Sequence, residues 1–141
     1  MLNDGLKLTG KLKMVLNGET FQEVDNLVVT AGKGYVAARR KDATATAMSH
    51  MAIGSGSTAA AASDTALGNQ LGRVALTSTA VSAAVVTYTA TFRSGTGTGA
   101  VTEAGLLNAS SGGTWLSRTV YSVANKDTSD PLPLPSHFKL R

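Results

Sequence analysis

Side chains that could carry out acid–base or metal chemistry are few in this sequence of 141 residues. The two histidines, His50 and His137, lie far apart, and neither has a second ligand at the spacing that zinc sites use. We expect each to be a strand residue that forms a hydrogen bond or faces solvent. Cysteine is absent, which excludes disulfides and thiolate chemistry. The sequence therefore predicts no metal site and no cofactor.

Asp64 and Glu103 are the carboxylates of the long segment 43–125, and two carboxylates can in principle act as a general acid and base. Single acids that flank strands are more often paired with an arginine or solvated, and Arg73 or Arg118 is the obvious structural partner for Glu103. A serine nucleophile would need an elbow such as Gly-x-Ser-x-Gly, which the sequence lacks. The residues predict that this protein is not an enzyme.

Glycine-rich segments could cradle a phosphate, but their spacing argues against that role. The segment GSGS at 54–57 is not followed by the Gly-Lys-Ser/Thr of a phosphate loop. The glycines of 95–99 have the wrong intervals for a dinucleotide site, and no helix pattern follows them. We therefore expect these segments to be flexible loops.

Basic residues give the chain a net charge of +4 and are concentrated before residue 42. Such clusters can contact nucleic acid, a membrane or an acidic protein surface. Nucleic-acid binding would call for aromatic platforms or a reader motif, and the sequence has neither. We expect contact with an acidic protein surface, through Lys7, Lys11, Lys13, Arg39 and Arg40.

The elements that must position these residues are mainly strands. Apolar and basic residues alternate through 6–16, which is typical of a strand, and Asn17-Gly18 predicts a hairpin turn to a second strand over 19–24. Thr30 is a good helix N-cap, and 31–41 reads as a short helix that Gly32 and Gly34 weaken. A further helical turn is expected near 66–70, and further strands over 46–53, 73–79, 85–92, 101–107 and 115–123.

These patterns predict one all-β domain over residues 1–141, a jelly-roll-like sandwich or barrel with one or two short helices. Within it, Trp115 is expected to be a core residue facing Leu106 or Tyr121, or else an anchor at an interface. Tyr88 and Phe92 are expected in the core.

The C-terminal segment 127–141 carries prolines at alternate positions, Pro131, Pro133 and Pro135. Alternate residues of a strand point their N–H groups to the same neighbour, so these prolines remove the donors along one edge. We therefore expect this segment to be an edge strand or an extended arm.

Charged side chains are scarce in the middle of the chain, with five between residues 43 and 125. A free-standing soluble surface carries about a quarter charged residues. We therefore expect copies of the chain, or a larger assembly, to cover much of its surface. No apolar stretch approaches the roughly 20 residues of a membrane helix, and no secretion signal is recognisable.

Several short sequence segments, taken in this order, resemble those of one protein family. They are NLVVTAGK at 26–33, MSHMAIGSGS at 48–57, SDTALGN at 63–69, TYTATF at 87–92, GAVTEAGLLN at 99–108 and LSRTV at 116–120. Over about residues 6–140 the chain resembles small β-rich structural proteins of tailed bacteriophages, and within that group most resembles head cement (decoration) proteins of short-tailed phages.

The resemblance implies a non-catalytic virion protein, made in the host cytoplasm, on the outer surface of the capsid. It would bind the major capsid protein and itself, as a homodimer, and stabilise the shell. The alternative within the same group is a tail-fibre or collar component that acts as a host-binding adhesin module. The C-terminal prolines depart from the family, in which Thr and Ile alternate at those positions.

Overall fold

The computed structural model describes residues 8–16, 19–42, 46–83, 85–93, 96–126 and 132–140. These residues form strands and one helix: β1 Leu8–Leu16, β2 Glu19–Val28, α1 Thr30–Asp42, β3 His50–Gly54, β4 Gln70–Ala75, β5 Ser78–Ser82, β6 Val85–Phe92, β7 Gly99–Leu107, β8 Trp115–Lys126 and β9 Leu132–Leu140. The prediction of an all-β fold with a short helix is confirmed.

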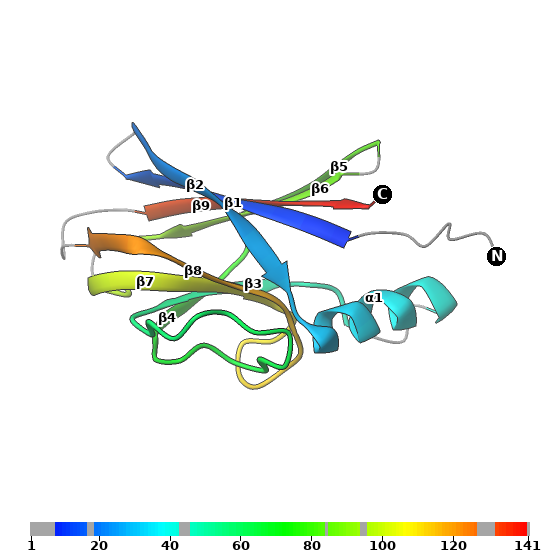
Figure 1. Cartoon of the computed structure of the whole chain (residues 1–141). Helices are drawn as coiled ribbons and strands as arrows, with labels where there is room; N and C mark the ends of the chain where they lie inside the picture. Colours follow the sequence, from blue (N-terminus) through cyan, green and yellow to red (C-terminus); the bar gives the residue numbers. More distant parts are fainter. Residues whose placement is uncertain are drawn as a thin grey trace.

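The strands form one antiparallel sheet in the order β4-β3-β7-β8-β2-β1-β9-β6-β5, which folds over itself (Figure 1). Strand β2 joins the two layers, because it pairs with β1 along most of its length and with β8 only through Leu27 and Val28. Strands β4 and β6 contact each other from opposite layers. The result is a sandwich made from a single folded sheet.

The alternation expected at the start of the chain is present in β1. Leu12 and Met14 are buried, whereas Thr9 and Lys11 are exposed. One face of the strand therefore packs on the core and the other faces solvent. The predicted turn at residues 17–18 lies outside the described residues, although β1 and β2 on either side of it pair antiparallel.

Two apolar clusters stabilise the packing of the two layers and of the segments that pack on them, α1 and the loop 55–69. The main core lies between the layers and includes Met14, Met51, Phe92 and Leu106, all nearly or fully buried. A second cluster lies on the outer face of the layer formed by β4, β3, β7 and β8, which is the lower layer in Figure 1. It contains Val29, Ala52, Leu107 and Trp115. Its cover comes from Ala31 at the start of α1 and from Leu67 in the loop 55–69.

Helix α1 confirms the helix predicted over 31–41 and packs against β8. A Cβ added at Gly32 would lie 2.7 Å from the Cα of Leu116 and closer still to its carbonyl oxygen. Gly32 is therefore required by the close approach of two backbones, although it is a weak helix former. Gly34 has open space around it.

Three element predictions need correction. The strand expected over 73–79 is two strands, β4 and β5, because the chain changes layers at residues 76–77. There the Leu76 N–H donates to Ser49 and the Thr77 N–H donates to Thr89. The strand expected over 46–53 begins only at His50. No helical turn forms at 66–70, where the chain enters β4.

The edge position expected for the proline-containing segment is wrong for its second half. Strand β9 pairs with β6 from residue 132 to 139, and with β1 from residue 136 to 140. The ladder to β1 stops at Ser136, next to Pro135, because prolines at 133 and 135 supply no N–H on that side. The proline half is thus paired on one side only, and the remainder is an interior strand. Pro131 lies outside the described residues.

Candidate partner-binding surface

The basic residues predicted to contact a partner lie on two different elements. Lys11 and Lys13 are on the solvent side of β1, where the register places Asp25 and Glu23 of β2 opposite them. Lys11 also lies 3.7 Å from Glu23, in an exposed ion pair. Carboxylates therefore offset the positive charge of this face. Lys7 lies outside the described residues.

Arg39 and Arg40 lie in the last turn of α1, where cations suit the negative end of the helix dipole. Both are exposed and line the mouth of a cleft of about 500 Å³ between α1 and the β5–β6 hairpin. Figure 1 shows α1 and this hairpin at the same end of the sandwich. The structure thus places two of the five predicted basic residues at a concave surface.

The hairpin wall of the cleft is built by cross-strand neighbours. Thr79 pairs with Tyr88 and Val81 with Val86, so these four side chains share one face of the hairpin. The floor is formed by Met48 and Leu116 of the main core. The sequence predicted Tyr88 in the core but could not show that the core is open there.

Two tyrosines, Tyr35 and Tyr88, line the cleft. The Tyr35 hydroxyl accepts a hydrogen bond from the Met48 N–H at 3.0 Å. Burial raises the pKa of Tyr88 to about 12, and nearby Tyr35 adds to this, while Arg39 opposes it. Tyr88 therefore stays a neutral phenol at physiological pH, and the arginines set the charge of the cleft.

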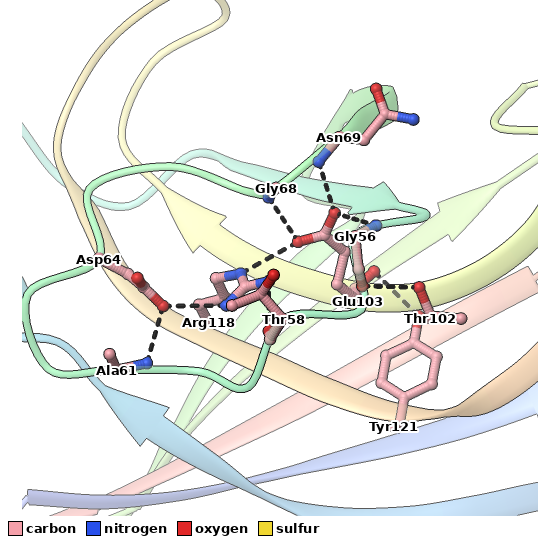
Figure 2. Close-up of polar contacts among 10 residues, drawn as sticks. All are labelled: Gly56, Thr58, Ala61, Asp64, Gly68, Asn69, Thr102, Glu103, Arg118 and Tyr121. Atoms are coloured by element: carbon pink, nitrogen blue, oxygen red, sulfur yellow. Dashed lines mark hydrogen bonds and ion pairs between the residues drawn. The ribbon is translucent and has the colours of Figure 1, made fainter.

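The candidate acid pair forms a different kind of site, a clamp on the outer face of the lower layer (Figure 2). Glu103 is fully buried and accepts backbone N–H donors from Gly56 and Asn69 on Oε2, at 2.6 and 2.8 Å. Its Oε1 accepts the Gly68 N–H at 2.7 Å and Arg118 Nε at 3.0 Å. All four donors belong to the chain itself, so each oxygen of the carboxylate accepts two internal hydrogen bonds.

Arg118 links the two carboxylates. Its Nη1 donates to Asp64 at 3.0 Å, and its Nη2 donates to the Thr58 carbonyl at 3.0 Å. Asp64 also accepts the Ala61 N–H at 2.8 Å. Glu103 therefore pairs with Arg118, one of the two expected partners. Arg73 instead bonds Gln70 and the carbonyls of residues 109 and 112.

The clamp holds the pKa of both carboxyls below their ordinary range. Burial raises the pKa of Glu103, but the three backbone hydrogen bonds and Arg118 together outweigh it. The hydrogen bond from Ala61 lowers the pKa of Asp64, burial opposes it, and Arg118 lowers it further. Both groups are thus anions that bind the loop 55–69 to the sheet, an arrangement suited to structure rather than proton transfer.

The glycines of this loop are needed for the clamp rather than for flexibility. A Cβ at Gly56 would lie 2.8 Å from Glu103 Cδ, and one at Gly68 would lie 3.2 Å from the Gly56 Cα. The loop expected to be flexible at 54–58 is therefore fixed through its own N–H groups. Sequence reasoning missed this clamp, because Glu103 is 34 to 47 residues away from its loop donors along the chain.

The other candidate residues have local roles. The Ser49 hydroxyl and His50 Nδ1 share a hydrogen bond of 2.7 Å at the start of β3, as expected of a strand histidine. Trp115 is buried in the second cluster, with the Arg73 guanidinium 5.4 Å from its ring centre. It is a core residue, but it packs beside Leu107 rather than Leu106 or Tyr121. The side chain of His137 lies outside the described residues.

Comparison with known proteins finds no match, whether against family models, curated proteins or solved structures. Among the described residues, no group of three or more acidic or histidine side chains could hold a metal ion. Helix α1, the one helix of that part of the chain, lacks the length and hydrophobicity of a membrane-spanning helix.

Proposed function

We propose that this protein is a cement protein of a tailed phage, which binds the major capsid protein on the outside of the head and stabilises the shell. The observation that carries the proposal is a β-sandwich whose β5–β6 hairpin has no charged residue and ends in an exposed edge strand. Such an edge favours pairing with another chain. The major capsid protein is proposed as the partner because the short sequence segments resemble those of phage head cement proteins.

The mechanism of such a protein is passive. A specific interface buries about 1,600 Å² in total, so many copies with modest contacts can brace a shell against internal pressure. We propose that each copy contacts capsid subunits and a second copy of this chain. Arg39 and Arg40 are better placed for an acidic capsid surface than Lys11 and Lys13, whose charges face Glu23 and Asp25.

Labelling of intact virions tests the location. Gold-conjugated antibody to this chain should decorate the head uniformly in electron micrographs. Label confined to the tail or collar would overturn the head assignment and favour the adhesin alternative. In that case the purified chain should also be retained on host surface polysaccharide, which a cement protein should not be.

A further inference from the structure

The cleft between α1 and the β5–β6 hairpin exposes apolar surface that the described chain does not cover. Val81 on its hairpin wall is 72% exposed, the highest value among the large apolar side chains of the described residues. Met48 and Leu116, which belong to the main core, form its floor. A partner's apolar side chain seated here would continue the core of the sandwich.

Strand β5 adds an open edge beside this apolar wall. It is the terminal strand of the sheet, pairs with β6 alone, and all five of its residues are exposed. No charged residue and no proline occur from residue 74 to 92. The edge thus lacks the lysines and prolines that normally prevent strand addition. An extended peptide could hydrogen-bond to it through its backbone.

The charge of the cleft selects among possible peptides. Of the described residues that line it, two are arginines and none is acidic. A second copy pairing through its own β5 would bring no carboxylate, because its hairpin is uncharged. Charge complementarity therefore favours an acidic segment of a different protein.

We infer that the cleft and the β5 edge together form a docking site for an extended, acidic segment of the major capsid protein; the identity of that partner rests on the proposed function. The segment lies along β5 and inserts an apolar side chain between Val81 and Tyr88. A neighbouring Asp or Glu of the segment reaches Arg39 or Arg40. A small ligand could fill the cleft, but it would make no use of the open strand edge.

The test measures binding of the full chain to phage heads that lack this protein, by co-sedimentation. Val81→Asp places an acid on the cleft wall, and Val123→Asp makes the same change at another exposed valine, on β8 and outside the cleft lining. Arg40→Glu reverses a charge at the mouth, and Lys33→Glu reverses an exposed charge elsewhere on α1. We expect at least tenfold weaker binding for the two cleft variants and changes within twofold for the two controls.

The possible outcomes separate the inference from the proposed function. Wild-type binding to heads with cleft variants equal to their controls would overturn the docking site and leave the cement function standing. Failure of the wild type to bind heads would overturn the cement function. The cleft is then tested with a fluorescent peptide of alternating Glu and Leu: saturable binding that Arg40→Glu weakens supports the docking site, and no binding overturns it.

Photo-crosslinking locates the partner segment. With benzoyl-phenylalanine at position 81 of the full chain, irradiated heads should yield a crosslink to an acidic segment of the capsid protein. A crosslink to a second copy of this chain, or to a basic segment, would overturn the inference.

Discussion

Glu103 joins three parts of the chain that are distant in sequence. It lies on β7, its donors lie at both ends of the loop 55–69, and Arg118 lies on β8. All four of its hydrogen bonds come from positively polarised donors, which is why a carboxylate can remain ionised with no exposed surface. Glu103 therefore ties both ends of the loop to the sheet.

Replacing that carboxylate with an amide should be costly. In Glu103→Gln one oxygen becomes an NH₂ group, so two donors face another donor whichever way the amide points. We expect the free energy of unfolding to fall by about 3–5 kcal/mol, as when one partner of a buried ion pair is removed. Urea denaturation measures this. The control Glu23→Gln, in an exposed pair, should change stability by less than about 1 kcal/mol.

The pH dependence of unfolding should follow the same carboxyls. Their folded pKa values lie below the unfolded ones, so their stabilisation is complete above the ordinary carboxyl range, about pH 4.3, and is lost as pH falls through the lower folded values. Urea unfolding from pH 7 to pH 2 should show this loss, with a smaller slope in Glu103→Gln. An equal slope in the variant would contradict the assignment.

At this scale the sequence allowed part of the clamp to be predicted. The pairing of Glu103 with an arginine followed from the scarcity of charge around it. The backbone donors of Gly56, Gly68 and Asn69 could not be foreseen, because N–H groups have no sequence signature and the loop is distant from β7 along the chain.

The seating of α1 depends on one of its two interior glycines. Gly32 faces the backbone of β8 and Gly34 faces open space, although both have the same low helix propensity. Propensity alone therefore ranks them equally, whereas packing separates them.

Alanine substitutions at these positions should have opposite effects. Gly32→Ala should lower the free energy of unfolding by about 1–3 kcal/mol, because the helix must move away from Leu116. Gly34→Ala should raise it by about 0.4–1 kcal/mol through helix propensity and a less flexible unfolded chain. Thermal unfolding followed by circular dichroism measures both. Two changes of the same sign would contradict the packing of α1 on β8.

Elements with strong local patterns were predictable, and those set by tertiary contacts were not. The alternation in β1 and β6 and the cap of α1 identify these elements from residues alone. The corner between β4 and β5 has no glycine or proline to mark it, since residues 76–77 are Leu and Thr. Pairing across the layers decides where the chain turns there.

Across the whole molecule, charge is distributed unevenly along the sheet order, between its middle strands β2 and β1 and its terminal strand β5. The β1–β2 face carries lysines opposite carboxylates, whereas β5 ends the sheet with small uncharged side chains. The scarcity of charge indicated that some surface must be covered. That coverage stays a prediction, and the strand order makes β5 its candidate by placing this strand at an edge.

Without its capsid partner, the purified chain should pair weakly with a second copy through the open β5 edge, and a lysine on that edge should reduce this association. In Ser78→Lys the new cation lies on β5, away from the cleft lining, and opposes strand addition. We expect the concentration-dependent association of the wild type in sedimentation velocity to decrease in this variant. Ser110→Lys, with the same charge in an exposed loop, should behave as the wild type. A wild type that stays monomeric at high concentration would contradict the need for a covered edge.

The interior position of β9 has a consequence for biosynthesis. Strand β9 is the sole bridge between β1 and the β5–β6 hairpin in its layer, yet it follows every other strand in chain order. While the ribosome is still translating residues 132–140, β1 has no partner on the side that β9 will occupy. The β5–β6 hairpin is then not yet paired with the rest of its layer. This layer of the sandwich can therefore be completed only after β9 has been synthesised, and a product terminated before it would expose an open edge on both β1 and β6.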